Sequence, residues 1–154
     1  MNKNRKILSH KDISSKITRI AHEIIEHHND LSNLALLGIH NRGVPIAGRL
    51  RKLIQDFTNV KIQLGSLDIT FHRDDFRERL TMPEIKGTDI QFDLSDKVII
   101  LVDDVLYSGR TIRAALDEIN SFGRPSIIRL AVLVDRGHRE LPIRADFVCL
   151  LYTS

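Results

Sequence analysis

The sequence predicts an α/β fold in which a parallel sheet is covered by helices on both of its faces. Apolar runs of strand length alternate along the chain with segments whose apolar residues recur at helical spacing, which is typical of such sheets. The strand-like runs are continuously apolar, as expected of strands buried on both faces. The 154 residues are 42% hydrophobic and 28% charged, the proportions of a globular protein with a hydrophobic core. We therefore expect residues 1–154 to form a single domain.

Three segments have the periodicity of an amphipathic helix. The first follows Ser9 and Asp12, which are spaced as a capping box, and isoleucines then recur every three or four residues. The second opens with Gly43 and has Pro45 in its first turn, where a missing amide hydrogen is tolerated. We expect these helices at about 11–28, from 43 onward and at 110–121.

Five apolar runs, separated by polar turns, have the length of buried strands. They are expected at Leu34–Ile39, Val60–Ile69, Lys97–Val102, Ile127–Val134 and Ala145–Leu151. Parallel strands present their carboxyl ends along one edge of the sheet, and ligands of such folds bind at that edge. Residues 70–96, in contrast, are polar and lack periodicity. A compact domain seldom has so long an irregular segment unless it is functional, so we expect a flexible lid there.

Charge and cysteine content restrict the classes of function. Lysine and arginine number 23 and aspartate and glutamate 20, so the net charge is +3 and an anionic partner is permitted. Cys149 is the only cysteine, which excludes a disulfide within the chain and a CxxC metal motif. The chain contains no apolar stretch of the roughly 20 residues that span a membrane, and no signal peptide. We expect a cytoplasmic protein.

The segment from Val98 to Thr111 contains the residues with the clearest chemical role. An apolar strand delivers two adjacent carboxylates, Asp103 and Asp104, to its carboxyl end, and Ser-Gly-Arg-Thr then leads into a helix. The free amides at a helix start favour an anion such as phosphate, and the hydroxyls of Ser108 and Thr111 can add donors. The carboxylates suit ribose hydroxyls, or a metal ion held through water.

A purely structural turn, with a capping serine and solvated aspartates, is the alternative interpretation. It would account for Ser-Gly-x-Thr alone, but it leaves the buried strand and the paired carboxylates unexplained. Neither GxxxxGK[ST] nor GxGxxG occurs in the sequence, so the usual nucleotide-binding motifs do not apply.

The segment Val102–Thr111 resembles the phosphoribosyl-diphosphate (PRPP) motif of the type I phosphoribosyltransferases. Other segments resemble one branch of that superfamily, the bacterial PyrR-like family of pyrimidine operon attenuation regulators and uracil phosphoribosyltransferases. They are Thr18–Glu23, Asp68–Thr70, Arg73–Asp75 and Leu130–Asp146. The resemblance implies a type I phosphoribosyltransferase fold, a parallel sheet with helices on both faces and a small hood. After Phe147 the family continues with a polar stretch and a further strand, so we expect a truncated C-terminus that lacks the last strand.

The resemblance also implies which residues bind PRPP and UMP. Asp103 and Asp104 would hold the ribose hydroxyls, and Arg42 would be the cation beside the diphosphate; these three are the expected catalytic residues. Mg²⁺ would be bound mainly through the diphosphate and water, without a metal site made of side chains. The expected substrate-binding set is Asn41, Arg42, Arg73, Asp103, Asp104, Val105, Leu106, Tyr107, Ser108, Gly109, Arg110, Thr111, Val134, Asp135 and Arg136.

The same resemblance implies binding to the leader RNA of a pyrimidine operon. The alternative is ordinary solvated charge, and because aromatic residues make up only 5% of the chain we do not expect base stacking to dominate. The expected RNA contacts are Thr18, Arg19, His22, His138, Arg139 and Arg144.

The expected function is therefore a regulator that senses UMP and has uracil phosphoribosyltransferase activity, assembled as a homo-oligomer. Uracil would replace diphosphate at the anomeric carbon of PRPP, with mainly electrostatic stabilisation of the leaving group. Two alternatives remain open at this point. One is an RNA-binding regulator without catalysis that uses PRPP or UMP as an effector, and the other is a phosphoribosyltransferase for another base.

Overall fold

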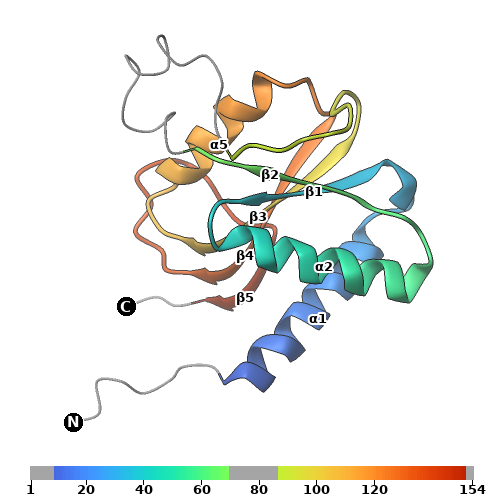
Figure 1. The fold of residues 1–154 in the computed structure, drawn as a ribbon. Coiled ribbons are helices and arrows are strands. Elements are labelled where there is room, and N and C mark those ends of the chain that lie inside the picture. The colour runs from blue at the N-terminus through green and yellow to red at the C-terminus, as the bar shows by residue number, and fades with distance from the viewer. Residues whose placement is uncertain (1–8, 70–86, 152–154) are drawn as a thin grey trace.

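The fold is a five-stranded parallel sheet with helices on both faces (Figure 1). The computed structural model describes residues 9–69 and 87–151. Its elements, in chain order, are α1 (His10–His27), the short 3₁₀ turn η1 (Leu31–Asn33), β1 (Leu34–Ile39), α2 (Gly43–Thr58), β2 (Gln63–Leu67), β3 (Val98–Leu106), α5 (Arg110–Asn120), β4 (Ile127–Asp135) and β5 (Phe147–Leu151). The predicted fold class is thus confirmed, and β1 has the predicted bounds.

The strand order is β2-β1-β3-β4-β5, and every neighbouring pair is parallel. From β1 the chain moves to one side of the sheet, and from β3 it moves to the other. The order therefore reverses between β1 and β3, and α/β folds bind their ligands beside such a reversal, at the carboxyl ends of the strands.

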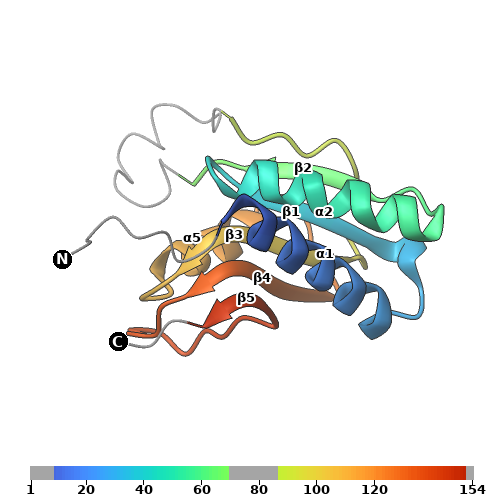
Figure 2. The same ribbon diagram turned by 90° about the horizontal axis from the view of Figure 1, so that it is seen from below.

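The two faces of the sheet bury separate hydrophobic clusters. α1 and α2 lie together on one face, and α5 lies on the other (Figure 2). Ile17 and Leu50 pack from the two helices against Val102 on the first face. Ile112 and Ile119 of α5 pack on the second face. Burial on both sides explains why the strands are almost continuously apolar.

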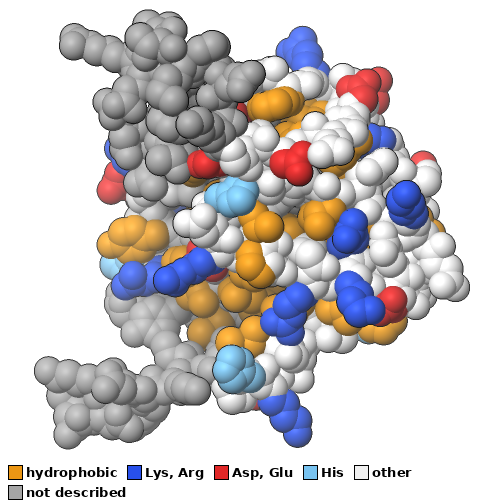
Figure 3. Space-filling view, in the orientation of Figure 1, with side chains coloured by type: hydrophobic (Ala, Val, Ile, Leu, Met, Phe, Trp, Pro, Cys, Tyr) orange, Lys and Arg blue, Asp and Glu red, His pale blue; other side chains and the backbone are white. Residues whose placement is uncertain are grey.

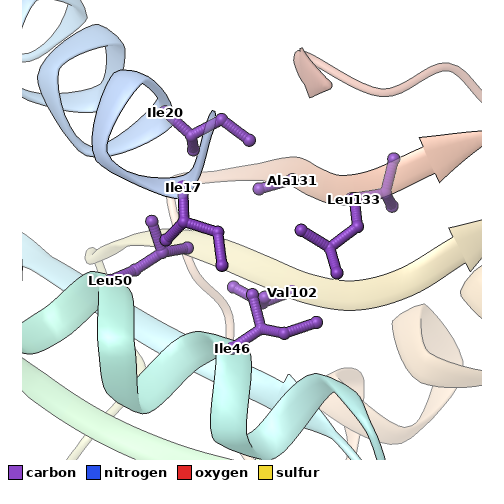
Figure 4. Close-up of a pocket in the computed structure, with 8 residues that line it drawn as sticks. Ile17, Ile20, Ile46, Leu50, Val102, Ala131 and Leu133 are labelled. Atoms are coloured by element: carbon purple, nitrogen blue, oxygen red, sulfur yellow. The ribbon is translucent and has the colours of Figure 1, made fainter. Parts of the chain in front are cut away.

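A small apolar cavity of about 10 Å³ lies between the helices of the first face and the sheet (Figure 4). Ile17 and Ile20 of α1, Ile46 and Leu50 of α2, and Val102, Ala131, Val132 and Leu133 of the sheet line it. A cavity of this size that is lined only by apolar side chains offers a water molecule no hydrogen-bond partner, so it is expected to stay dry.

The first helix begins at the predicted capping box. The Ser9 hydroxyl accepts a hydrogen bond from the Asp12 amide at 3.1 Å, and the Asp12 carboxylate accepts one from the Ser9 amide at 3.2 Å. These bonds satisfy amides that the first turn of a helix leaves without a partner, and they also hold the pKa of Asp12 below its usual value.

Four of the five strands differ from the predicted ranges: β4 ends one residue later, at Asp135, β5 begins at Phe147 instead of Ala145, and β3 and β2 differ more. β3 was expected to end at Val102, but it continues to Leu106, because β4 pairs with Asp103, Val105 and Leu106 beyond that point. Asp103 and Asp104 therefore lie near the end of the strand rather than in a loop. β2 is shorter than predicted and spans Gln63–Leu67, the five residues that pair with β1.

Part of the segment predicted to be a lid is packed against the sheet. Asp89 pairs with Ser66 in an isolated antiparallel bridge, and Leu94 is fully buried under α5. Residues 70–86, which contain Arg73, lie outside the described residues, so the lid remains a prediction for that part. Among the described residues, no helix is long and apolar enough to cross a membrane.

Candidate functional site

The reversal of strand order brings the loop after β1 against the end of β3. Gly43 begins α2 so close to β3 that a Cβ atom at this position would overlap the carbonyl oxygen of Val102 and lie 3.1 Å from the Cα atom of Asp103. Arg42 consequently stands over the strand end, with its Nη1 atom 3.9 Å from a carboxylate oxygen of Asp104. The peptide bond between His40 and Asn41 is cis. The structure thus brings together the predicted cation and the predicted carboxylates.

The two neighbouring carboxylates have different surroundings. Asp103 is buried, 7% exposed, and its Oδ1 atom accepts a hydrogen bond from the Asp104 amide at 2.8 Å. Burial and then the adjacent Asp104 carboxyl raise the pKa of Asp103 to about 7. The side chain of Asp104 is 27% exposed and faces the site beside Arg42. One group can therefore hold a proton near neutral pH, while its neighbour is open to a ligand.

The loop between β3 and α5 is tied to the connection between β4 and β5, residues 136–146, which we call the β4–β5 connection. Three successive carbonyl oxygens accept hydrogen bonds from it. The Leu106 oxygen accepts from the Arg136 amide at 2.9 Å, and the Ser108 oxygen from the amides of Glu140 and Leu141 at 2.8 and 3.2 Å. The Tyr107 oxygen accepts from the Arg139 guanidinium at 3.0 Å.

These bonds orient the amides of the same loop. In a trans peptide unit the C=O and N–H bonds point in opposite directions, and the only cis bond among the described residues lies elsewhere. With the three carbonyls aimed at the β4–β5 connection, the amides of Tyr107, Ser108 and Gly109 point away from it. Within residues 9–69 and 87–151, none of these three amides has a hydrogen-bond acceptor.

The amides of the loop merge with the start of α5. Gly109 is the N-cap with φ of 96°, a left-handed conformation that favours glycine. A Cβ atom at this position would lie 3.5 Å from side-chain atoms of Leu141 and Ile143 in the β4–β5 connection. No side chain caps the helix, although the Ser108 hydroxyl accepts a hydrogen bond from the Arg110 amide at 3.2 Å. Successive free amides and the helix dipole form an anion-binding surface.

The arrangement therefore fits a ligand that carries both hydroxyl groups and an anion. The amides of residues 107–109 and the helix start can bind a phosphate group, and the carboxylates of Asp103 and Asp104 can accept hydrogen bonds from vicinal hydroxyls. Arg42 adds a cation that is 84% exposed and free to reorient. Among the described residues, no group of three histidine, cysteine or carboxylate side chains is placed to bind a metal ion.

Val134, Asp135 and Arg136, the last three residues of the predicted substrate-binding set, lie beside the same loop. Val134 pairs with Val105 in the sheet, and Arg136 places its guanidinium 5.0 Å from the centre of the Tyr107 ring. The Asp135 side chain, however, is directed into the β4–β5 connection, where it accepts hydrogen bonds from the Arg139 guanidinium and the Gly137 amide. The hydrogen bond from Arg139 holds the pKa of Asp135 below its usual range.

The residues predicted to bind RNA lie in two groups. Thr18, Arg19 and His22 lie on α1, where the His22 ring stacks on Phe57 of α2 with centroids 4.3 Å apart. Arg19 also donates hydrogen bonds to the carbonyl oxygens of β5 at Val148 (2.8 Å) and Cys149 (3.3 Å). Figure 3 shows Lys and Arg side chains spread over the face that carries α1 and α2, with hydrophobic side chains between them.

The second group lies in the β4–β5 connection. His138 and Arg144 are exposed, and the His138 ring lies 5.4 Å from the Tyr107 ring. Arg139 is only 23% exposed and makes four hydrogen bonds within the protein. His138 and Arg144 are thus accessible to a partner, whereas most donors of Arg139 are used in hydrogen bonds within the protein.

The bonds between the β4–β5 connection and the β3–α5 loop were not predicted. Among them is an ion pair in which Arg110 Nε lies 2.5 Å from a carboxylate oxygen of Glu140. The partners are about thirty residues apart in sequence, and only the pairing of β3 with β4 brings them together. The family resemblance had singled out Leu130–Asp146, but nothing in the spacing of its residues indicated this contact.

Comparison with known proteins agrees with this geometry. A family model described as the phosphoribosyl transferase domain matches residues 3–152. A protein from Deinococcus radiodurans named Bifunctional protein PyrR is 56% identical over 142 residues, which cover 92% of this chain and 78% of that protein. A protein of the same name from Clostridioides difficile is 54% identical over 142 residues, covering 92% and 80%.

The fold also resembles crystal structures of other phosphoribosyltransferases. A hypoxanthine-guanine phosphoribosyltransferase from Bacillus anthracis superposes with a TM-score of 0.76 at 16% identity, covering 98% of this chain and 85% of that chain. The hypoxanthine phosphoribosyltransferase of Trypanosoma cruzi superposes with a TM-score of 0.75 at 16% identity, covering 98% of this chain and 83% of that chain. At this identity the likeness concerns the fold alone. Since the relatives are more than half identical over nine tenths of the chain, this chain belongs to the PyrR family of the phosphoribosyltransferases.

Proposed function

We propose that this chain is a pyrimidine operon regulator that also transfers the phosphoribosyl group of PRPP to uracil, giving UMP and diphosphate. One observation supports the transferase role most directly. The paired carboxylates of Asp103 and Asp104 and the free amides of residues 107–109 lie at one strand end, on a chain of the PyrR family. Ribose hydroxyls and a 5′-phosphate are the groups that such a pair of donors and acceptors would recognise.

In this proposal the loop and the helix start bind the 5′-phosphate, which keeps its charge throughout the reaction. Ser108 and Thr111 add hydroxyl donors at the same place. Asp103 and Asp104 accept hydrogen bonds from the ribose hydroxyls and so fix the ring in relation to the anomeric carbon. Holding the ring while the glycosidic bond changes is the entropic part of catalysis.

The leaving diphosphate needs positive charge. Arg42 is exposed and 3.9 Å from Asp104, so it can turn toward a diphosphate that lies between the two strand ends. Asn41 lies next to it in the same loop. Mg²⁺ bound with the substrate would supply further charge neutralisation. Mg²⁺ usually keeps its waters and takes only one or two carboxylates, so the partly exposed Asp104 fits such an ion without a side-chain cage.

Uracil would dock between Val134, Arg136 and the Tyr107 ring. Arg136 and Tyr107 already lie in cation–π contact, and a planar base can pack on the same group of side chains. Closure of residues 70–86, including Arg73, over the site would exclude water from PRPP; this part of the proposal falls outside the described residues.

The regulatory role would use the half-buried Thr18 and the exposed side chains of Arg19, His22, His138 and Arg144. RNA would approach through its phosphates, because the net charge is positive and aromatic residues are few. Assembly as a homo-oligomer in the cytoplasm belongs to the same proposal.

The transferase proposal is tested by incubating the full chain with PRPP, Mg²⁺ and each base separately. Formation of UMP with uracil alone supports it. Absence of product with every base, despite binding of UMP in calorimetry, would reduce the proposal to a regulator that uses the nucleotide as an effector. Product from hypoxanthine or orotate, and none from uracil, would replace uracil as the substrate.

A further inference from the structure

We infer that the RNA-binding surface continues from α1 onto α2, where Arg49 contacts a phosphate group and Phe57 stacks on an unpaired base. The inference rests on the proposed regulatory function, and it adds two residues that the sequence did not single out. We call this surface the α1–α2 seam. It consists of one row of residues on each helix, Ser14, Thr18 and His22 on α1 and Arg49, Leu53 and Phe57 on α2.

The two rows lie side by side. Residues four apart lie on one side of a helix, so each row follows one edge of its helix for about two turns. The rows meet at both ends. Arg49 Nη2 donates a hydrogen bond to the Ser14 hydroxyl at 2.8 Å, and the Phe57 ring stacks on the His22 ring with centroids 4.3 Å apart and an angle of 21° between the planes.

The two contacts show that α1 and α2 run in the same direction. Position 14 meets position 49 and position 22 meets position 57, so both contacts join residues that are 35 apart in sequence. The helices therefore stay in register between the two contacts, and Figure 2 shows them next to each other on one face of the sheet. An RNA strand that follows the row on α1 would thus also meet the row on α2.

The net positive charge of the two helices comes from α2. Within its bounds α1 has three lysines or arginines and three aspartates or glutamates, and Arg19 is paired with Glu23 at 3.4 Å. α2 has three cations and a single carboxylate, Asp56, which pairs with Lys52 at 3.2 Å. Arg49 is exposed and has no carboxylate partner among the described residues, because its bond goes to a neutral hydroxyl. Its charge is therefore available to a phosphate group.

Phe57 keeps a large part of its ring open to solvent. It is 47% exposed even though the His22 ring covers one face of it. Exposure alone does not indicate a ligand, because Phe122 is 44% exposed. Phe57 differs from Phe122 because its stacking partner is one of the expected RNA contacts. A stacked pair of rings at the surface can accept a further base, and such stacking is tolerant of sequence because every base has a π-face.

The combination of a free cation and an open ring fits single-stranded RNA. The bases of loops and bulges are unstacked and can pack on aromatic side chains, while their phosphates remain accessible to cations. Eight residues of helix span about 12 Å, so Arg49 and Phe57 would contact different nucleotides of one strand. A symmetric contact with a second copy of the chain, in contrast, would bring two net-positive α2 helices together, which is unfavourable.

The test compares Phe57→Leu and Arg49→Gln with Phe122→Leu and Arg113→Gln. Phe122 and Arg113 are the matched controls, because both are exposed and lie on or next to α5, on the opposite face of the sheet. Binding of the pyrimidine operon leader RNA is measured at saturating UMP and at several salt concentrations. UMP formation and thermal melts of the same variants check that the fold is intact.

The two contacts have different expected signatures. Phe57→Leu should weaken binding about tenfold and leave the slope of log affinity against log salt unchanged, because a stacking contact neutralises no phosphate. Phe57→Trp, which keeps a ring, should retain the affinity. Arg49→Gln should weaken binding and lower the slope by about one. Phe122→Leu and Arg113→Gln should match the unchanged protein.

Photo-crosslinking gives a readout that does not depend on affinity. Leader RNA that carries 4-thiouridine should crosslink to the tryptic peptide 53–61, which contains Phe57, and the crosslink should be lost in Phe57→Leu but not in Phe122→Leu.

Three outcomes decide against the inference in different ways. Unchanged RNA affinity of Phe57→Leu and Arg49→Gln, with weaker binding by Arg144→Gln, would overturn it and leave the proposed function intact. Unchanged RNA affinity of Phe57→Leu with an altered sedimentation coefficient would assign the α1–α2 seam to a contact between copies of the chain. Absence of RNA binding by the unchanged protein would contradict the regulatory proposal itself.

Discussion

Asp103 is a buried acid in a place where the proposed ligand needs a charged acceptor. Its pKa of about 7 means that the folded protein binds this proton more tightly than the unfolded chain does. The contribution to stability is fully present below about pH 4 and is lost as the pH rises through 7. Burial therefore opposes ionisation of Asp103, whereas its proposed role as a hydrogen-bond acceptor for ribose requires the ionised form.

Replacing Asp103 with asparagine should show both sides of this conflict. The asparagine side chain has the same size, and its carbonyl oxygen can still accept the hydrogen bond from the backbone amide of Asp104, but it carries no charge. We expect Asp103→Asn to raise the free energy of unfolding at pH 8 by on the order of 2 kcal/mol and to remove its decline between pH 4 and 7. Affinity for PRPP should fall tenfold or more, since a charged acceptor is lost.

Chemical denaturation across this pH range and calorimetry with PRPP measure the two effects. Asp56→Asn is the control, because Asp56 is an exposed aspartate on α2 that pairs with Lys52 at the surface. A stability profile of Asp103→Asn that still falls between pH 4 and 7 would mean that another group causes the decline.

Gly43 offers a second prediction at a single residue. A methyl group here would overlap the Val102 carbonyl, so Gly43→Ala must push the start of α2 away from β3. We expect a loss of about 1–3 kcal/mol in stability and weaker PRPP binding, because Arg42 moves with the loop. Gly48 is the matched control: it lies in the same helix, and a Cβ there meets no atom within 4 Å. Gly48→Ala should stabilise the protein by about 0.5–1 kcal/mol. Thermal melts of both variants, with similar shifts, would contradict this account of Gly43.

At the scale of elements, the sequence was sufficient wherever a local pattern determined the outcome. The capping box at Ser9, the helical spacing of the isoleucines in α1 and the apolar run of β1 each predicted an element that the structure contains. The end of β3 was placed too early, because two aspartates look like the start of a loop, and only pairing with β4 keeps them in the strand.

The site divides in the same way. The Ser-Gly-Arg-Thr turn and the carboxylates follow from neighbouring residues, so the sequence could locate them. The bonds from the β4–β5 connection join positions that are distant in sequence, and no periodicity encodes such contacts. For the same reason the sequence could not distinguish Arg139, whose donors are directed inward, from Arg144, which is exposed.

The β4–β5 connection therefore provides a clean test of RNA binding at Arg144. Its side chain is exposed and has no bond to another described residue, so its removal should not disturb the fold. We expect Arg144→Gln to weaken leader RNA binding and to lower the slope of log affinity against log salt by about one, as for the loss of one phosphate contact. Arg113→Gln serves as the control for net charge. Equal slopes for both variants, measured by filter binding at several salt concentrations, would assign Arg144 to ordinary solvated surface.

At the scale of the whole molecule, the two helices of the first face are joined to the sheet around an unfilled space. The cavity beside Val102 and Ala131 has lining side chains that lack contacts on one side, which costs dispersion energy. A natural protein need not remove such a defect as long as it remains stable enough to function.

Adding one methylene group at this position should therefore stabilise the protein. We expect Val102→Ile to raise the urea midpoint by an amount that corresponds to about 0.5–1 kcal/mol, with an unchanged m-value. Val98→Ile is the control, because Val98 lies on the same face of β3 but does not line the cavity. A lower midpoint for Val102→Ile would show that the surrounding side chains cannot accommodate the added group.

The order of the strands also has a kinetic consequence. β1 pairs with β2, which follows it closely in the chain, whereas its other neighbour begins at Val98, opposite Leu34. Closing the larger loop costs more chain entropy, so β1 and β2 with α2 can assemble before β3 joins them. The proposed substrate site lies across this boundary between β1 and β3. A nucleotide that contacts both β1 and β3 would bind only after these two strands have paired. It should therefore slow unfolding of the entire sheet rather than protect one half of it.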